Sequence, residues 1–296
     1  MLEIQPGHIT IDEISMPAAT GKKLSVSVLR LDKIHPLLSG NKWFKLRYYL
    51  EEAKEQNKKK ILTWGGAWSN HILATAVACQ QQGLDSTGII RGEEPKELSP
   101  TLIMAKEAGM ELVFTSRDVY RDKKLPISLH NDDHYMIPEG GYGRLGAEGA
   151  ATILDLVSKN EFTHFCCAAG TGTMTAGLIK AASPSNHIVS ISVLKNNHEL
   201  EQNINALVTG KNRYYTLLHD YHFGGYAKHP PELLEFMNSF YRQTAIASDI
   251  VYTGKLFYAV NDLIANDFFD AGNNLLIIHS GGLQGNSSLE KGTLIF

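Results

Sequence analysis

The sequence of 296 residues contains only three cysteines, Cys79, Cys166 and Cys167. Three cysteines cannot form a disulfide framework, and the adjacent pair would point to opposite faces of a strand because side chains alternate along it. We therefore expect reduced, mostly buried thiols. The 12 histidines contain no HExxH pattern and do not cluster with the cysteines at ligand spacing. No metal site is predicted.

Long apolar runs and blocks of one charge are also absent. No segment approaches the roughly 18 consecutive apolar residues of a transmembrane helix, and the N-terminal MLEIQPGHITIDEI lacks an apolar signal core. The formal net charge is -3, and no Lys/Arg block is long enough to follow a phosphate backbone. We expect no nucleic-acid partner, no membrane association and a cytoplasmic location.

The composition that remains is that of a globular protein, with 43% hydrophobic and 20% charged residues. Single cores stop growing at roughly 250 to 300 residues, so two lobes are expected. Short apolar runs alternate with helical patterns, which predicts an α/β fold of parallel-rich open sheets. The expected strands lie at 61–66, 87–92, 111–116, 134–141, 163–170 and 187–194, and the expected helices at 69–83, 99–109, 146–160 and 173–182.

The predicted units divide the chain into two domains. Residues 50–150 carry their own β/α units and are expected to form a small inserted domain, while 1–49 and 151–296 form the large one. No Pro-rich linker separates them, so the lobes should pack directly against each other. A cleft between packed lobes is a common ligand position.

A glycine loop, AAGTGTMTAG at 168–177, joins an expected strand to an expected helix. Small residues there let backbone N–H groups close on an anion at a helix N-terminus, which suits a phosphate. The loop lacks the Lys-Ser/Thr ending of nucleoside-triphosphate loops and does not match GxGxxG. A tight turn without a ligand is the alternative.

Three further segments place polar residues at similar points. In WGGAWSNH (64–71), Ser69 and Asn70 can cap a helix, or bind a carboxylate and a ring hydroxyl. Ser280 lies in IIHSGG, after another expected strand, and Tyr252 in VYTGK begins a helical pattern. The segment SGNKWFKLRYYL opens a helix with Lys42, which is either a solvated lysine or a reactive one.

Taken in order, SGNKWFKL, GGAWSNH, AAGTGT, VYTGK and HSGG resemble the family of 1-aminocyclopropane-1-carboxylate deaminases and D-cysteine desulfhydrases. These are pyridoxal-phosphate enzymes of the tryptophan synthase β-type fold, a two-lobed fold with helices on both faces of its sheets. The likeness extends from about Arg30 to Gly285. Trp68 stands where the family usually has Gln, and the segments before Lys42 and after Leu194 are shorter than in the family.

The resemblance implies a role for each motif. Lys42 would carry pyridoxal 5'-phosphate covalently, since a desolvated lysine amine condenses with an aldehyde once it has lost its proton. The phosphate would be bound by Lys45 and by the loop of Gly170, Thr171, Gly172 and Thr173. Ser69, Asn70 and His71 would bind the substrate carboxylate, with Asn70 also near the ring hydroxyl. Tyr252 and Tyr226 match the family's active-site tyrosines, and Ser69 or Tyr252 could move the α-proton if Lys42 does not.

Two positions favour one activity of the family. Its deaminases have Glu after the tyrosine and Leu in HLGG, whereas its desulfhydrases have hydroxyl residues, as this chain does at Thr253 and Ser280. A hydroxyl facing the pyridine nitrogen leaves the ring largely neutral, which β-elimination tolerates. We expect a homodimeric lyase acting on a small amino acid such as D-cysteine. The alternatives are a 1-aminocyclopropane-1-carboxylate deaminase, an inactive protein that keeps the cofactor fold, and a nucleotide-binding α/β protein.

Overall fold

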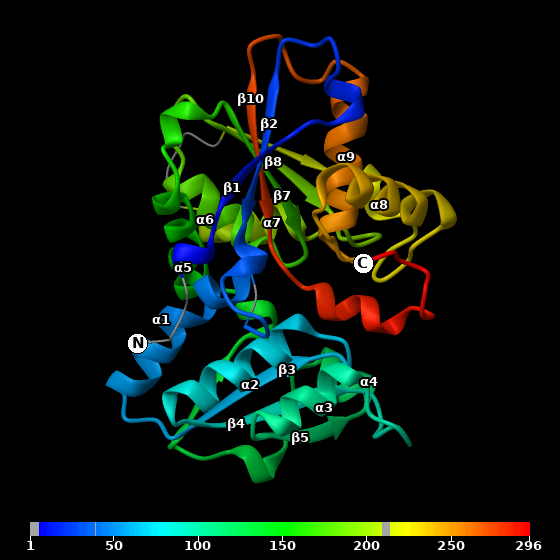
Figure 1. Ribbon diagram of the computed structural model, residues 1–296. Coiled ribbons are helices and arrows are strands. Elements are labelled where there is room, and N and C mark those ends of the chain that lie inside the picture. Colours follow the sequence, from blue (N-terminus) through cyan, green and yellow to red (C-terminus); the bar gives the residue numbers. More distant parts are fainter. Residues whose placement is uncertain (1–5, 39, 209–213) are drawn as a thin grey trace.

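A computed structural model describes residues 6–38, 40–208 and 214–296. Two separate sheets lie one above the other in Figure 1, with helix α1 at the level between them on the left. The fold is therefore α/β and two-lobed, as the sequence predicts.

The large sheet has six strands in the order β1-β2-β10-β7-β8-β9. Its strands are parallel except β1, which pairs with β2 in the antiparallel sense. The central strands carry continuous buried runs, as is typical of parallel strands covered on both faces. The strands are β1 (Ile11–Ile14), β2 (Ser25–Arg30), β7 (His164–Ala169), β8 (His187–Ser192), β9 (Tyr215–Leu218) and β10 (Asn274–His279).

Helices cover both faces of the large sheet. Figure 1 shows α5 and α6 on one side and α8 and α9 on the other. Leu256, Phe257 and Val260 of α9 join a buried cluster with the strands on their side. The helices of this lobe are α5 (Arg144–Ala151), α6 (Thr173–Ala181), α7 (Leu200–Leu207), α8 (Pro231–Thr244) and α9 (Thr253–Ala265).

The small sheet has four strands in the order β5-β4-β3-β6, all parallel. Helices α2 and α3 lie on one face, while Trp64, Tyr120 and Leu129 form a separate cluster on the other. The elements are β3 (Lys60–Gly65), α2 (Asn70–Gln82), β4 (Asp85–Arg91), α3 (Pro100–Glu107), β5 (Met110–Thr115), α4 (Arg117–Arg121) and β6 (His134–Ile137).

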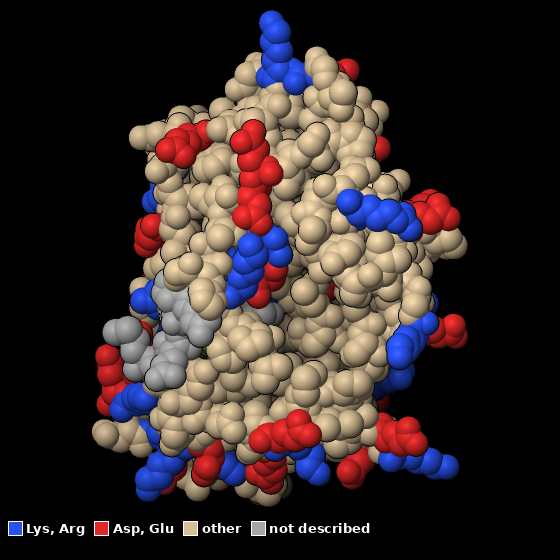
Figure 2. All heavy atoms as spheres, in the orientation of Figure 1, with Lys and Arg blue, Asp and Glu red and all other residues tan. Residues whose placement is uncertain are grey.

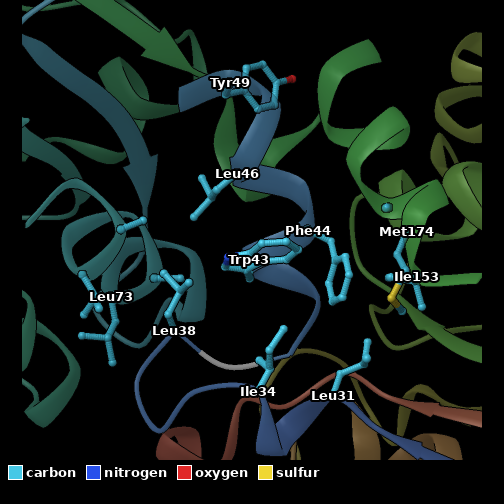
Figure 3. Close-up of a cluster of buried hydrophobic side chains, with 14 of the residues drawn as sticks. Leu31, Ile34, Leu38, Trp43, Phe44, Leu46, Tyr49, Leu73, Ile153 and Met174 are labelled. Carbon is cyan, nitrogen blue, oxygen red and sulfur yellow. The ribbon is translucent and has the colours of Figure 1, made fainter. Parts of the chain in front are cut away.

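Helix α1 (Asn41–Glu55) lies between the two lobes and is buried on two sides. Figure 3 shows Leu46 pointing to one side of α1, the side on which Leu73 of α2 lies, and Phe44 pointing to the other side, toward Ile153 and toward Met174 of α6. The hydrophobic effect therefore fixes α1 in rotation, which also fixes the side chains at its first turn.

The predicted strands and helices are present, with bounds that differ by a few residues. The largest difference is the helix predicted for 146–160, because α5 ends at Ala151 and a 3-10 segment follows to Leu156. The Thr152 hydroxyl donates to the carbonyl of Gly149 at 2.7 Å, at the point where the helix ends. Helix α5 lies in the segment predicted to be the inserted domain, yet it packs against α6 of the large lobe. The division at residues 50 and 150 stays a prediction.

The surface carries both charges. On the face shown in Figure 2, Lys and Arg lie interspersed with Asp and Glu, most densely over the small sheet. Across residues 6–38, 40–208 and 214–296, no helix combines the length and apolar character needed to cross a membrane.

Candidate active site

The carboxyl ends of both sheets meet at one cavity of about 500 Å³. Residues that follow β3, β4, β6, β7, β8 and β10 all line it, which is the usual ligand position in open α/β sheets. The size lies within the range of small-molecule sites. Among the predicted site residues, those that line this cavity are Lys42, Lys45, Ser69, Asn70, His71, Gly170, Thr171, Gly172, Tyr226, Tyr252 and Ser280.

Lys42 lies in the first turn of α1, where the helix touches the loop after β10. Gly40 precedes the helix with φ +65, and a Cβ built on it would lie 1.7 Å from the Ser280 carbonyl oxygen. Only glycine allows this approach. The amine of Lys42 donates to Asn41 Oδ1 at 3.1 Å. Burial lowers its pKa from 10.5 to about 8, although the negative charge of Asp249 acts in the other direction and raises it.

Lys45 lies one turn further along α1 and is only 5% exposed. Its amine is 3.5 Å from the Gly140 carbonyl oxygen, and its pKa is lowered well below the ordinary value, first by burial and then by the charge of Lys42. In the described ranges no carboxylate lies within ion-pair distance of either amine. Two buried amines at one cavity favour an anionic ligand, because its negative charge would raise the pKa of both amines and stabilise their protonated forms.

The loop after β7 forms the opposite wall. Gly172 has φ +80 at the N-cap of α6 and makes no side-chain cap, so the N–H groups of the first turn are presented to the cavity. A Cβ on Gly172 would lie 2.6 Å from Ile204, and one on Gly170 would lie 3.3 Å from the Tyr252 ring. Asn197 donates to the Gly170 carbonyl at 3.0 Å and holds the loop in place.

Thr173 differs from the prediction in its position. It is fully buried and does not line the cavity, because its side chain turns back to the Thr171 hydroxyl at 2.9 Å. Thr171 is therefore the hydroxyl of this loop that faces the cavity.

Helix α2 presents a second N-terminus. The Ser69 hydroxyl caps it by accepting from the Ile72 N–H at 3.4 Å, which leaves the hydroxyl proton for another acceptor. Asn70 Oδ1 accepts from Gln284 Nε2 at 2.6 Å. The Asn70 amide nitrogen then faces Gly282, where a Cβ would lie 2.3 Å away.

His71 is buried next to the two lysines. Its Nε2 lies 2.8 Å from the Thr63 hydroxyl, which donates its own proton to the Ile137 carbonyl. Thr63 can therefore only accept, so Nε2 carries the proton and Nδ1 is an acceptor. That Nδ1 is buried without a partner in the described part of the chain, and burial and the two lysine charges lower the His71 pKa well below 6.5.

Tyr252 is held by a buried carboxylate that sequence reasoning did not single out. Asp249 accepts from the backbone N–H groups of Val251, Tyr252 and Thr253 at 2.8 to 2.9 Å. Burial raises the pKa of Tyr252 well above 10. The phenol therefore stays protonated at neutral pH.

Thr253 also differs from the prediction in its position. Its hydroxyl donates to Asp249 Oδ1 at 2.7 Å and accepts from the Asp249 N–H, and the residue is fully buried outside the cavity lining. The hydroxyl that the sequence predicts at a pyridine nitrogen is therefore available at Ser280, which lines the cavity, and not at Thr253.

Tyr226 reaches the cavity from the large lobe and is 44% exposed. Its loop is anchored by Lys255, a fully buried amine that donates to the carbonyls of Gly225 at 2.7 Å and His222 at 2.9 Å. Burial is the main cause that raises the Tyr226 pKa.

Several cavity residues were missed by the sequence reasoning. Arg91 ends β4 and Glu139 follows β6, and a position at the carboxyl end of a strand could have singled them out. Tyr142, Asn197 and Asn203 come from loops and helices whose approach to the cavity has no local signal in the sequence.

Comparisons with known proteins identify relatives of this chain. The family model described as pyridoxal-phosphate dependent enzyme matches residues 15–281. A Pyrococcus horikoshii protein provisionally named a 1-aminocyclopropane-1-carboxylate deaminase is 30% identical over 268 residues, covering 84% of this chain and 81% of that protein. The bifunctional D-cysteine desulfhydrase/1-aminocyclopropane-1-carboxylate deaminase of Arabidopsis thaliana is 28% identical, covering 84% of this chain and 70% of its own length. The crystal structure of a homologue of 1-aminocyclopropane-1-carboxylate deaminase superposes with a TM-score of 0.82 at 27% identity, covering 96% of this chain and 92% of that one.

Proposed function

The chain belongs to the family of pyridoxal-phosphate dependent enzymes, and from this premise we propose that it catalyses β-elimination and deamination of a small amino acid. The proposed reaction is that of a D-cysteine desulfhydrase, which gives pyruvate, ammonia and sulfide. The observation that carries the proposal is the Lys42 amine, with its pKa near 8, in one cavity with the open N-terminus of α6.

The residues present fit the cofactor. Two buried amines without a carboxylate partner favour a ligand with a phosphate, and a Cβ at Gly172 would collide with Ile204, which keeps the backbone of that loop bare. Lys42 would carry the aldehyde carbon, Asn70 would bind the ring hydroxyl and Ser280 the ring nitrogen. Lys45 and the loop of Gly170, Thr171 and Gly172 would bind the phosphate, with Thr173 supporting Thr171. When bound, the cofactor withdraws electrons from the α-carbon of the substrate and makes its C–H bond acidic.

The start of α2 suits the substrate carboxylate. N–H groups at a helix N-terminus and the free proton of the Ser69 hydroxyl are donors for an anion. His71 offers only an acceptor at Nδ1. We therefore propose that it accepts a hydrogen bond from a protonated group of the ligand and does not bind the carboxylate itself.

Proton transfer falls to Lys42. Among the cavity residues discussed, its amine has a pKa near the working pH, whereas those of Tyr252 and Tyr226 are raised. The two phenols can therefore donate hydrogen bonds to a leaving thiolate. Ser69 lies at the start of α2, where its free proton could serve the opposite face of a D-amino acid.

The desulfhydrase reaction is favoured over ring opening by the absence of a free carboxylate. Glu139 is the one acidic side chain among the described cavity residues, and it is bound by Lys123 at 2.5 Å. A hydroxyl at the ring nitrogen leaves that nitrogen unprotonated, so the ring accepts electrons less strongly. Elimination tolerates this because the electron pair leaves with the β-substituent.

Cofactor loading and keto-acid release test the proposal together. Purified protein with added pyridoxal phosphate should absorb in the visible, and D-cysteine should yield pyruvate. Lys42→Ala should abolish the band and the product, whereas Lys54→Ala on the exposed side of α1 should retain both. A Lys42→Ala protein that keeps the band would refute the assignment.

The same assay separates two other candidates. Release of 2-oxobutyrate from 1-aminocyclopropane-1-carboxylate, and no pyruvate from D-cysteine, would identify the deaminase that the relatives' names also include. A visible band without turnover of any amino acid would identify an inactive protein that binds the cofactor.

A homodimer in the cytoplasm is the proposed setting. The family resemblance supports the dimer, and the three buried free thiols are compatible with a reducing compartment. Light scattering at two concentrations would measure the assembly.

A further inference from the structure

Arg91 ends β4 and lines the cavity from the side of the small sheet. Its Nη2 lies 3.9 Å from a Cβ built on Gly66, so the guanidinium stands beside the loop that leads into α2. The same guanidinium lies 5.9 Å from the centre of the Tyr120 ring. The residue is exposed, and its charge lies at the cavity wall where a ligand can reach it.

The nearest acidic side chain at the cavity is already occupied. Glu139 accepts from the Tyr120 hydroxyl and from the Lys123 amine, both at 2.5 Å. Arg91 itself has no ion pair within residues 6–38, 40–208 and 214–296. The cavity thus holds a cation that no carboxylate of the described residues neutralises.

The other cations of the cavity have assignments. Lys42 and Lys45 would serve the cofactor, and the start of α2 would serve the substrate carboxylate. Tyr226 lines the same cavity as Arg91, near enough for the arginine charge to act on its phenol. Its hydroxyl makes no hydrogen bond with the residues that the structure describes. A guanidinium and a phenol that line one cavity can both donate to one anionic group.

We propose that Arg91, together with Tyr226, binds an anionic leaving group on the β-carbon of the substrate, so that the enzyme also accepts amino acids with a sulfonate or a phosphate there. This inference rests on the proposed function and adds amino acids with an anionic β-substituent to its substrate class. The planar fork of arginine binds such groups through two parallel hydrogen bonds, which a lysine cannot reproduce.

Cysteate is the probe, because its sulfonate is both the anionic group and the leaving group. The α-proton passes to the Lys42 amine, the Cβ–S bond breaks with its electron pair on sulfur, and water replaces the imine nitrogen. Cysteate and water then give pyruvate, ammonium and hydrogen sulfite, with no oxidant or reductant. β-Chloroalanine undergoes the same elimination with a neutral side chain.

The experiment compares kcat/KM for the two enantiomers of cysteate and β-chloroalanine in wild type, Arg91→Gln and Arg91→Lys. The cysteate to β-chloroalanine ratio should fall by about ten- to a hundredfold in Arg91→Gln, the scale of one lost charge-assisted hydrogen bond, and only partly recover in Arg91→Lys. Arg117→Gln, which removes a guanidinium from the exposed surface of the same lobe, should leave the ratio unchanged.

Binding of an unreactive anion supplies a second readout. Sulfoacetate should bind the cofactor-loaded wild type more tightly than propionate by calorimetry, and Arg91→Gln should erase the difference. An equal loss of kcat/KM for cysteate and β-chloroalanine in Arg91→Gln would place Arg91 at the α-carboxylate and overturn the inference. Equal binding of sulfoacetate and propionate to the wild type would overturn it as well. Failure of the proposed function looks different, because neither substrate would release a keto acid while the Arg91-dependent binding of sulfoacetate remained.

Discussion

Gln284 Nε2 donates a hydrogen bond of 2.6 Å to Asn70 Oδ1, across the gap between the loop after β10 and the start of α2. This bond fixes which end of the Asn70 amide faces the cavity. The amide oxygen is occupied, so the amide nitrogen remains as a donor for the ring hydroxyl of the proposed cofactor.

Replacing Gln284 with Glu should reverse that orientation. A carboxylate cannot donate to Asn70 Oδ1, so the Asn70 amide should turn its nitrogen toward Glu and its oxygen toward the cavity. The dissociation constant of pyridoxal phosphate should rise by about tenfold, as expected for one lost hydrogen bond. Gln284→Met, which frees the amide without reversing it, should have a smaller effect in the same spectral titration; equal effects would contradict the orientation.

Cofactor capture should depend on pH through Lys42. Only the neutral amine reacts with an aldehyde, and burial lowers its pKa from 10.5 to about 8. The rate at which the visible band appears should therefore increase with pH and level off above about pH 8. Stopped-flow absorbance checks this, and a rate that still increases toward pH 10 would show that the amine is not desolvated.

Asp249 should affect both stability and that pH profile. Its buried carboxylate accepts from three backbone N–H groups and the Thr253 hydroxyl. An asparagine side chain would have an NH2 donor in place of one of the two accepting oxygens. Asp249→Asn should lower the free energy of unfolding by about 2 to 4 kcal/mol. Because the Asp249 charge raises the Lys42 pKa, its loss should also shift the levelling point of the capture rate to lower pH.

Thr253→Val is the matched control for Asp249→Asn. It removes one hydrogen bond to the carboxylate but keeps the charge. The free energy of unfolding should therefore fall by about 1 to 2 kcal/mol, while the pH profile of the capture rate should not shift. A shifted profile in this variant would assign the effect to loop geometry and not to charge.

Gly40 should tolerate no side chain. Ala there would meet the Ser280 carbonyl at 1.7 Å as well as adopt φ +65, so Gly40→Ala should displace α1 from the β10 loop and weaken cofactor binding by at least tenfold. Gly21 has φ +78, and no atom of the described residues lies within 4 Å of a Cβ built on it, so Gly21→Ala isolates the cost of the backbone conformation. Thermal unfolding and cofactor titration should show a loss of about 1 kcal/mol in stability and unchanged binding for Gly21→Ala.

The sequence predicts the fold because its signals are local. Period-two and period-3.6 patterns, interrupted by glycine loops, locate most strands and helices to within a few residues. The short antiparallel strand β1 has no such pattern, since Ile11–Ile14 is only half-buried at a sheet edge. The packing of α5 on α6 depends on Gly177, where a Cβ would lie 2.6 Å from the Ala147 carbonyl oxygen, a contact between distant segments.

The site is predicted only in part, because sequence patterns report local structure and not contacts between distant segments. Motif order identifies the residues at the starts of α1, α2 and α6, which are positions that a strand-loop-helix pattern determines. Hydrogen-bond partners are a tertiary property, so neither the turn of Thr253 toward Asp249 nor the bond from Gln284 to Asn70 could be read from the chain. The solitary charge of Arg91 likewise becomes visible only when Glu139 is found to be occupied by Lys123.

The two sheets direct their carboxyl ends at one cavity, so each lobe supplies part of the wall. A ligand bound there contacts both lobes at once and links them. Its binding free energy is then added to the resistance of the lobes to separation. Loading the protein with cofactor should accordingly protect the connections between the sheets from proteolysis, most strongly at the segments on either side of α1.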